Sequence, residues 1–312
     1  MSMKVLVTGG AGYVGSVLVP LLLQHGYEVT VLDNLMYGGE GLLPCFYFKN
    51  FSFFRGDIRD EVLVRTLLKD AEAVIHLAAI TGYPACKKDE RLAYDVNLFG
   101  THTIGKHLRS DQTIVFASTG SNYGALVGQV CTEDTPLNPL TVYGMTKTAA
   151  EKFLMNNCNT IAYRFATAFG ISPRLRLDLL IHDLVYQALR ARNLVIYEKN
   201  FKRTFIHVRD MAQAFLFALE NREALAHNVF NVGAESMNFT KEELVNKIRA
   251  RLDFYIHFAE VGKDEDQRNY DVSYQKIAAK GFRPLIPFDQ GLDEVIRALR
   301  LVEVKNPYSN VL

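Results

Sequence analysis

The sequence predicts an α/β fold, a doubly wound parallel sheet with helices on both faces and a smaller mixed α/β lobe. Two observations support this prediction. Short apolar runs of strand length alternate with amphipathic stretches through the first half of the chain, and this rhythm breaks after about residue 166. Because parallel strands need a crossover connection between them, a repeated strand–helix–strand order is typical of a parallel sheet.

The expected strands are rich in β-branched or aromatic residues, and they cover residues 4–8, 27–33, 51–56, 73–79, 113–118 and 160–165. Amphipathic helices are expected between most of them, over residues 12–25, 60–69, 89–109 and 143–156. Ligands in such sheets bind at the carboxyl ends of the strands. We therefore expect the functional site at that edge of the sheet.

The second half of the chain is organised differently. Residues 167–202 are predicted to form a loop and a helix, and residues 203–232 return to a strand–helix–strand pattern that can rejoin the sheet. The remainder is helix and short strand, closing with an amphipathic helix over about 288–303. We therefore predict a first domain of residues 1–166, joined by 203–232, and a second lobe woven from 167–202 and 233–312.

Composition limits the partners and the location of the protein. Thirty-five Lys and Arg residues balance 34 Asp and Glu residues, so the formal net charge is +1 and no charged block argues for nucleic acid or a membrane surface. Any anionic ligand must be met by local groups. The four cysteines have neither zinc-site spacing nor the density of a disulfide scaffold. No leader peptide or membrane-spanning stretch is recognisable, so a cytoplasmic protein is expected.

A glycine-rich loop opens the chain. In VLVTGGAGYVGS, Gly9, Gly12 and Gly15 follow a predicted strand and lead into a predicted helix. Glycine lets the backbone approach a pyrophosphate closely, and the helix N-terminus offers it free N–H groups. Asp33, about 20 residues further on, can accept hydrogen bonds from an adenosine ribose and would repel a 2′-phosphate. The pattern predicts a Rossmann-type dinucleotide site for NAD rather than NADP.

The spacing GxxGxxG, together with Tyr143 and Lys147 in a YxxxK motif, resembles the short-chain dehydrogenase/reductase superfamily. Within it, the chain is most similar to the extended branch of nucleotide-sugar epimerases and dehydratases of the UDP-glucose 4-epimerase type. Further segments match in order over nearly the whole chain, namely GDIRD (56–60), VIHLAA (74–79), NLFGT (97–101), STGSNYG (118–124), YRFATAFG (163–170) and KRTFIHVRDMAQA (202–214). The resemblance implies NAD as cofactor and a nucleotide-diphosphate sugar as partner.

The resemblance also implies which residues hold the cofactor. They are Gly9, Gly12, Tyr13, Val14, Gly15, Asp33, Asn34, Asp57, Ile58, Leu77, Ala78, Ala79, Asn97, Ala117, Tyr143, Lys147 and Phe165. Asp57 and Ile58 match the pair that contacts adenine in the family. Residues 74–79 match the strand edge beside the nicotinamide ribose.

Tyr143 and Lys147 form the expected reactive pair. They are four positions apart in a predicted helix and therefore project from one face. Oxidising a sugar hydroxyl needs a base for its proton, and tyrosine, with a free pKa of about 10, becomes one when Lys147 stabilises the phenolate. By resemblance, Lys147 also holds the nicotinamide ribose and Thr119 hydrogen-bonds the reacting sugar oxygen. The alternative is that Tyr143 packs on a helix surface and Thr119 only caps a turn.

The two residues after Thr119 bear on the type of reaction. Dehydratases of the family have Asp-Glu there, which eliminate water, and decarboxylases keep a glutamate. Neither Gly120 nor Ser121 can transfer protons in this way, so dehydration is not expected. Epimerisation at carbon 4 needs only removal of hydride, rotation of the keto sugar and return of hydride to its other face.

The resemblance places substrate contacts at Thr81, Thr119, Ser121, Thr167, Arg203 and Arg268. Arg203 and Arg268 match the family's diphosphate-facing arginines, and a planar guanidinium suits two phosphate oxygens. Salt bridges to neighbouring aspartates are the alternative. Thr81 and Thr167 stand where relatives often have lysine and asparagine, so the sugar can be unusual. The nucleotide and the sugar stay open, and Cys86 in the same loop is read as a buried structural thiol.

Three functions remain open at this stage. The first is a nucleotide-sugar 4-epimerase with Tyr143 as acid and base, and the second is a 4-dehydrogenase or 4-ketoreductase that releases its product. The third is a dinucleotide-sensing protein without activity, which loss of the tyrosine or lysine would favour. No metal is expected, because His76 and His207 lack partner ligands at metal spacing. By resemblance alone, a homodimer is expected through helices 89–109 and 143–156.

Overall fold

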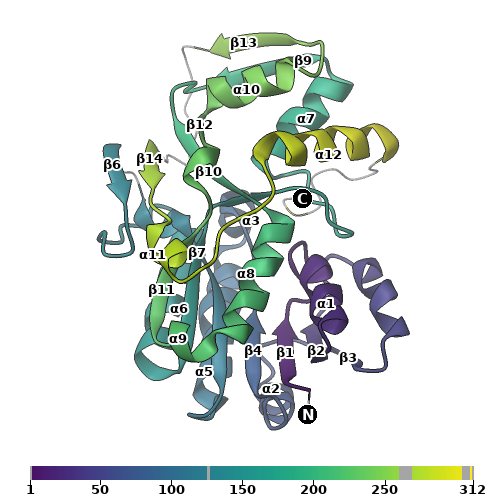
Figure 1. Cartoon of the computed structure of the whole chain (residues 1–312), viewed down its shortest axis with the longest axis vertical. Coiled ribbons are helices and arrows are strands. Elements are labelled where there is room, and N and C mark those ends of the chain that lie inside the picture. Colours follow the sequence, from purple (N-terminus) through teal and green to yellow (C-terminus); the bar gives the residue numbers. More distant parts are fainter. Residues whose placement is uncertain (1, 125–126, 260–268, 304–309, 311–312) are drawn as a thin grey trace.

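A computed structural model describes residues 2–124, 127–259, 269–303 and 310 of the protein. One large sheet and its helices form the lower part of the molecule in Figure 1, and a smaller group of strands and helices lies above them. The mixed α/β architecture follows the alternation of strands and helices along the first half of the chain.

The large sheet has seven strands, all parallel to their neighbours, in the order β11-β7-β5-β4-β1-β2-β3. These strands are β1 (Lys4–Thr8), β2 (Glu28–Asp33), β3 (Phe51–Arg55), β4 (Ala73–His76), β5 (Thr113–Thr119), β7 (Thr160–Phe165) and β11 (Asn228–Val232). The chain begins at β1, moves outward to β3, returns to β4 and continues toward the opposite edge. The order therefore reverses between β1 and β4, where doubly wound sheets bind their ligands. The predicted fold class is confirmed.

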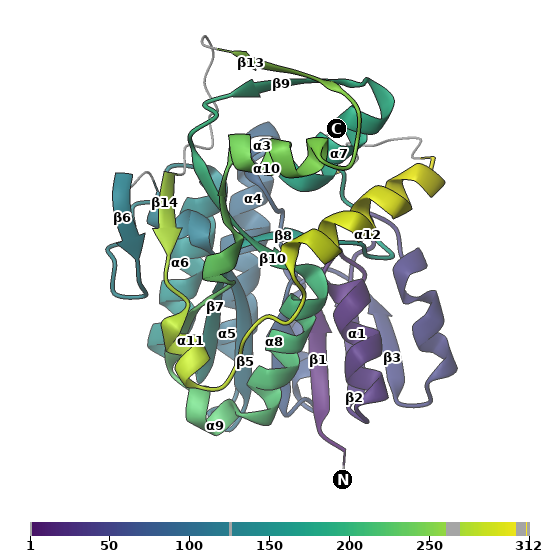
Figure 2. The same ribbon diagram turned by 45° about the horizontal axis from the view of Figure 1, so that its top comes forward.

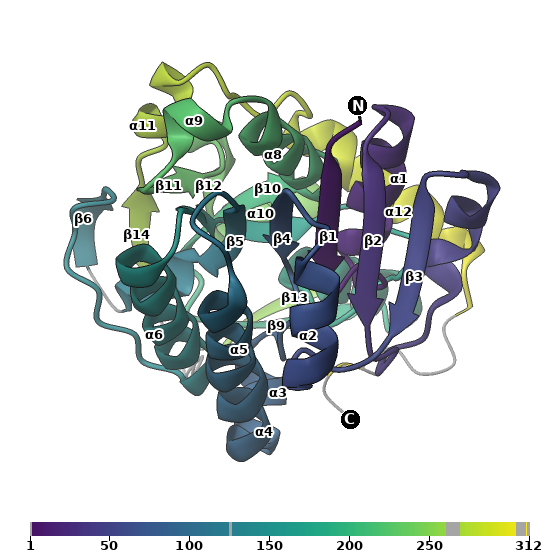
Figure 3. The same cartoon turned by 90° about the horizontal axis from the view of Figure 1, so that it is seen from below.

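Helices cover both faces of this sheet, as the view from below shows (Figure 3). One face carries α1 (Gly15–Gln24) and α8 (Val208–Glu220), and the other carries α2 (Glu61–Leu68), α5 (Thr101–His107) and α6 (Val142–Asn157). Because apolar helix faces lie on both sides, β4 and β7 are buried along their whole length. No helix within the described ranges is long and apolar enough to cross a bilayer.

The helix predicted over residues 89–109 is present as a continuous helical run over residues 90–107 that contains a π-helical turn, and a short helix that was not predicted precedes it. The structure divides residues 83–107 into α3 (Tyr83–Lys88), α4 (Glu90–Tyr94), the π-helix η2 (Asp95–Gly100) and α5. Asp89 has a non-helical backbone, and its side chain accepts a hydrogen bond from Leu92 N at 2.8 Å, so it begins a new helix instead of continuing one. Asn97 lies within the π-helical turn, a feature often found at functional sites.

The upper lobe is built from several separate segments around its own core. Its sheets pair β12 (Asn238–Thr240), β10 (Lys202–His207) and β8 (Thr167–Phe169), then β13 (Tyr255–Ala259) with β9 (Asn193–Tyr197), and β14 (Asn269–Val272) with β6 (Val127–Cys131). Figure 2 shows α7 (Leu180–Arg190), α10 (Lys241–Arg249) and α12 (Phe288–Leu301) beneath β9 and β13. Within residues 203–232, β10 joins a lobe sheet, whereas β11 forms an edge of the large sheet.

Short helices complete the described chain. They are η1 (Glu40–Tyr47), η3 (Gly120–Tyr123), α9 (Arg222–Leu225), η4 (Glu235–Met237) and α11 (Gln275–Ala279). The lobe core contains Phe169 and Phe205 from β8 and β10 together with apolar residues of α7, α10 and α12. Because β8 follows β7 directly, the carboxyl end of the large sheet faces the lobe, and the site lies between the two.

Candidate active site

A pocket of about 300 Å³ opens at the carboxyl ends of the large sheet's strands, beside the point where strand order reverses. Twenty of the residues singled out from the sequence line it: Gly9, Gly12, Tyr13, Val14, Gly15, Asp33, Asn34, Asp57, Ile58, Leu77, Ala78, Ala79, Thr81, Ala117, Thr119, Ser121, Tyr143, Lys147, Phe165 and Thr167. Asn97 and Arg203 do not line this pocket, and Arg268 lies outside the described residues.

The glycine loop leaves no room for side chains at its tightest points. Gly9 has φ +73°, and a Cβ added there would lie 2.6 Å from Ala78 N. A Cβ on Gly15 would lie 2.5 Å from Gly10 O. Helix α1 begins at Gly15 without a side-chain cap and without an acidic residue in its first turn. The loop and the free N–H groups of the helix therefore fit the diphosphate of a dinucleotide.

Asp33 is fixed at the end of β2 by two backbone donors. Ala11 N donates to its Oδ2 at 2.9 Å and Leu35 N donates to its Oδ1 at 2.8 Å. Burial raises the pKa of this carboxyl group, while the two N–H donors oppose that rise. Each carboxylate oxygen retains a lone pair for a ribose hydroxyl, so the residue fits the role predicted for it.

Asn97 lies behind the pocket wall and supports it. Its side chain bonds both backbone groups of Ile80, accepting from Ile80 N at 2.8 Å and donating to Ile80 O at 2.9 Å. It also donates to Thr146 Oγ1 of α6 at 3.2 Å. These bonds hold the loop after β4 in place, and a direct contact of Asn97 with the cofactor stays a prediction. Cys86 donates to the same Ile80 oxygen, and burial raises the pKa of its thiol to about 12.

Helix α6 presents Tyr143 and Lys147 to the pocket, as their spacing predicts. Its start is fixed by Thr141, whose hydroxyl accepts from Gly144 N at 3.2 Å. The Lys147 side chain is buried, and Nζ lies 3.9 Å from the centroid of the Phe116 ring. Burial lowers the pKa of Lys147 to about 7, although Glu151 opposes this shift. α6 thus places the Tyr143 phenol and an amine of lowered pKa, Lys147, along one wall of the pocket.

Thr119 both caps a turn and lines the pocket. It ends β5, and its Oγ1 accepts from Ser121 N at 3.1 Å and donates to Ser121 Oγ at 3.2 Å. Capping the turn and contacting a ligand, the two roles considered for Thr119 from sequence, are therefore compatible. A hydroxyl oriented by the turn keeps a lone pair available for a ligand.

A buried ionic network that sequence reasoning missed lies behind Thr119. The Arg164 guanidinium of β7 donates to the Glu151 carboxylate of α6 at 2.6 Å, and Ser118 donates to the same carboxylate at 2.5 Å. Arg164 also donates to Tyr123 Oη at 3.1 Å. The network joins β5, β7 and α6, which carry Thr119 and the reactive pair. No spacing rule links these residues, because they meet only after the sheet forms.

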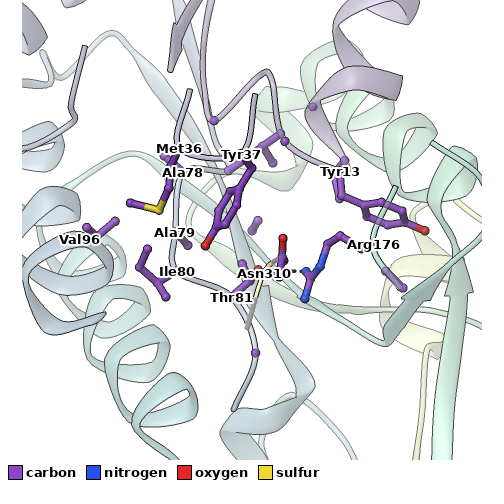
Figure 4. A pocket seen from close by; sticks show the side chains of 18 of the residues that line it. Tyr13, Met36, Tyr37, Ala78, Ala79, Ile80, Thr81, Val96, Arg176 and Asn310 are labelled. Carbon is purple, nitrogen blue, oxygen red and sulfur yellow. Dashed lines mark hydrogen bonds between the residues drawn. The ribbon is translucent and has the colours of Figure 1, made fainter. Parts of the chain in front are cut away.

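The loop between β8 and α7 contributes a second group that was not predicted. Arg174 and Arg176 line the pocket, and Figure 4 shows Tyr37 and Arg176 pointing into it from two different segments. Arg176 pairs with Asp178, and its Nη1 donates to Thr81 Oγ1 at 2.9 Å. The signal in the sequence was the run SPRLRLD, in which two arginines alternate with apolar residues in an expected loop.

Arg203 lies beside the main pocket. It is 5% exposed, and it lines a much smaller cavity that shares Phe165, Ala166 and Thr167 with the main one. Its Nη1 donates to Lys202 O at 3.2 Å. Within the described ranges, no group of three His, Cys, Asp or Glu residues is placed to hold a metal ion.

The chain is similar in sequence and in structure to NAD-dependent nucleotide-sugar enzymes. The family model described as "NAD dependent epimerase/dehydratase family" matches residues 5–233. UDP-glucose 4-epimerase of Halalkalibacterium halodurans is 34% identical over 273 residues, which are 79% of this chain and 80% of that protein. dTDP-glucose 4,6-dehydratase of an Actinoplanes species is 29% identical over 321 residues, 94% of this chain and 97% of that protein. The crystal structure of Thermus thermophilus UDP-glucose 4-epimerase with NAD superimposes with a TM-score of 0.81 at 28% identity, covering 96% of this chain and 99% of that one.

Proposed function

Because the chain belongs to the NAD-dependent epimerase/dehydratase family, we propose that it is a nucleotide-sugar epimerase acting by transient oxidation at carbon 4 of the sugar. The cofactor is NAD, which supplies an acceptor for the hydride of carbon 4 and a donor for its return. The observation that carries the proposal is that Tyr143, Lys147 and Thr119 line the same pocket as the dinucleotide cradle.

Tyr143 is proposed to take the proton of the sugar hydroxyl and later to give it back. A phenol does this at neutral pH only if positive charge stabilises its phenolate. Lys147 lies one helical turn away on the same wall, in an environment where its charge is poorly screened by water. The Thr119 hydroxyl can accept from the sugar alcohol with its free lone pair, and it can donate to the ketone when its O–H turns away from Ser121 Oγ.

The distribution of carboxylates supports epimerisation over dehydration. Asp33 and Asp57 are the acidic residues among the described pocket lining, and they follow β2 and β3. The strand order places those strands on the far side of β1 and β4 from β5, which carries Thr119. Gly120 and Ser121 offer no carboxyl group beside Thr119. Elimination of water therefore lacks its acid and base at the reacting end.

The substrate is proposed to be a nucleotide-diphosphate sugar. UDP-glucose and dTDP-glucose appear in the names of the relatives above, which supports this class without selecting a nucleotide. Thr81, Ser121 and Thr167 line the pocket and are proposed to contact the sugar. Arg203 is proposed to reach the substrate diphosphate through the adjoining cavity that opens beside Thr167.

Replacing Tyr143 with phenylalanine tests the proposal. Purified protein is incubated with UDP-glucose, dTDP-glucose, GDP-mannose and UDP-glucuronic acid, and the products are followed by NMR together with NADH absorbance. We expect a 4-epimer without net NADH, and a loss of about 10²–10⁴-fold in turnover for Tyr143→Phe with unchanged NAD content. Tyr47→Phe, at an exposed tyrosine of η1, is the matched control and should keep full activity.

Three results would redirect the proposal. A released ketone with stoichiometric NADH would make the protein a 4-dehydrogenase, which uses the same residues. Unchanged turnover in Tyr143→Phe would remove this tyrosine from the chemistry. Absence of turnover on every nucleotide sugar, with NAD still bound, would favour a dinucleotide-sensing protein.

A homodimer is part of the proposal. The helices expected to pair expose Tyr94, Phe99 and Met145, at 37%, 54% and 42%, which supports an apolar contact across α4, η2 and α6. Light scattering should give twice the chain mass, and Phe99→Asp should shift the measured mass toward that of the single chain.

A cytoplasmic location is also proposed, since all four cysteines are free thiols.

A further inference from the structure

The loop of residues 170–178 is fastened onto the start of the dinucleotide helix. Tyr13 Oη donates to Gly170 O at 2.7 Å, and Ser172 Oγ donates to Tyr13 O at 2.7 Å. The hydroxyls of Ser16 and Ser172 lie 2.8 Å apart. All three hydrogen bonds are buried, so they compete little with water. The loop is therefore held against the N-terminus of α1.

His182 braces the same loop from the lobe side. Its Nε2 accepts from Gly170 N at 2.9 Å, which fixes the tautomer and leaves Nδ1 as the donor to Arg176 O at 2.6 Å. Burial lowers the pKa of His182 to about 4, so this arrangement persists at neutral pH. A loop tied at both sides presents its arginines in a defined position.

The charges of the two arginines in this loop are balanced differently. Arg176 is paired with the Asp178 carboxylate. Arg174 donates to Leu175 O at 3.3 Å, and among the described residues no carboxylate lies within 4.0 Å of its guanidinium. Its guanidinium carbon lies 4.6 Å from the centroid of the Tyr37 ring. A half-buried guanidinium that stacks on an aromatic ring and lacks an ion-pair partner is ready to receive an anion.

The position of Arg174 and Tyr37 in the pocket indicates which anion the guanidinium would bind. Tyr37 and its neighbours Met36 and Gly38 follow the ribose-binding Asp33, and all line the pocket. Arg174 comes two residues after Ser172, which touches the start of α1. The stacked pair therefore joins two loops that flank the glycine cradle. That cradle is where the NAD diphosphate fits.

We propose that Arg174 and Tyr37 form a clamp that closes over the diphosphate of NAD and keeps the cofactor bound between turnovers. The guanidinium supplies the charge and the paired donors, while the Tyr37 ring holds it in place. This inference deepens the proposed function, because an enzyme that reuses one NAD for oxidation and reduction needs a slowly released cofactor. The diphosphate of a sugar nucleotide is the other source of the same chemistry, and the test separates the two.

The test measures retention of NAD by the purified protein in the absence of any sugar. Protein loaded with NAD⁺ is freed of excess cofactor, and the NAD that remains is released by heat at timed intervals and quantified. We expect Arg174→Met to raise the dissociation rate about 10- to 100-fold, as befits loss of a charge-assisted bond. Arg174→Lys should give an intermediate rate, because it keeps the charge and loses the fork. Arg300→Met, at an exposed arginine of α12, is the matched control and should behave as wild type.

Three further measurements distinguish a direct ionic contact from a general structural disturbance. Arg174→Met should weaken binding of ADP-ribose, which has the diphosphate, and leave binding of adenosine unchanged. Tyr37→Ala should accelerate NAD release without removing a charge. Higher salt should narrow the gap between wild type and Arg174→Met, because the lost interaction is ionic.

Unchanged NAD dissociation in both Arg174→Met and Tyr37→Ala would overturn the clamp. Equal weakening of ADP-ribose and adenosine would also overturn it, by showing a general disturbance of the pocket. If NAD dissociation is unchanged in Arg174→Met but this variant binds UDP more weakly than wild type, Arg174 contacts the substrate diphosphate. The assignment to NAD is then wrong. Slow NAD release in wild type together with no turnover of nucleotide sugars would refute the proposed function without refuting the clamp.

Discussion

Replacing Gly9 with alanine probes the dinucleotide cradle at one of its tightest points. Gly9 has φ +73°, in the left-handed region, and an added Cβ would lie 2.6 Å from N and 2.8 Å from Cα of Ala78. Both of these are backbone atoms in the loop after β4, so neither can move aside as a flexible side chain would. The substitution therefore forces the glycine loop and the loop after β4 apart.

The size of the effect follows from two contributions. An alanine in the left-handed region costs about 1–2 kcal/mol. Insertion of a methyl group into a tight backbone contact adds about 1–3 kcal/mol. The free energy of unfolding should thus fall by about 2–5 kcal/mol. Because the displaced loop carries the N–H groups that face the diphosphate, affinity for NAD should fall at least about tenfold, which corresponds to about 1.4 kcal/mol.

Gly26→Ala is the matched control. Gly26 has φ +83°, and an added Cβ would meet nothing within 4 Å. It therefore carries the backbone strain alone, about 1–2 kcal/mol, and it lies at the far end of α1 from the cradle. Both alanines restrict the unfolded chain equally, so that effect cancels in the difference. Urea denaturation of NAD-free protein and NAD titration measure both variants. Equal destabilisation, or unchanged NAD affinity in Gly9→Ala, would refute the reasoning.

Three further predictions concern buried charge. Arg164→Met should lower the free energy of unfolding by about 3–5 kcal/mol in urea denaturation, because it leaves Glu151 buried and unpaired, and adding Glu151→Leu should recover part of the loss. Asp33→Asn should raise NADP affinity relative to NAD at least about tenfold in dissociation constants measured by titration, because the charge that repels a 2′-phosphate is removed. In NAD-free protein, Lys147 has a pKa of about 7 against an ordinary 10.5, so the unfolded chain binds the extra proton between these values. Its contribution to the free energy of unfolding should rise with pH across that window, and Lys147→Met should remove the rise in a pH series.

Local patterns carried most of the fold prediction. β1, α1 and β2 follow from an apolar strand, a glycine turn and a helical apolar stripe, all readable within about 30 residues. Asp33 sits at the end of β2, where its distance from the glycines placed it. Tyr143 and Lys147 share a helix face because their spacing is close to one turn. These inferences succeed because each depends on short-range geometry.

Long-range contacts limited the prediction. Glu151 and Arg164 are 13 residues apart in sequence, and they meet because α6 packs against β7 on one face of the sheet. The arginines of residues 170–178 alternate with apolar residues, but no local pattern predicted that the hydrogen bonds of this loop would reach back to Tyr13 and Ser16. Arg203 was placed at the pocket by its motif, yet β10 pairs with β8 in the lobe and puts it on the adjoining cavity.

Thr81 shows how such a long-range contact changes the meaning of a sequence departure. Relatives of the galactose type often have lysine at this position, so the threonine suggested an unusual sugar. In the structure, Arg176 donates to Thr81 Oγ1 at 2.9 Å, and a cation occupies that corner from a different element. Since Asp178 pairs with Arg176, the corner is electrically balanced and holds both hydrogen-bond donors and acceptors. Under the proposed function, a sugar hydroxyl placed at this corner would therefore find both donors and acceptors, even though the lysine of relatives is replaced by Thr81.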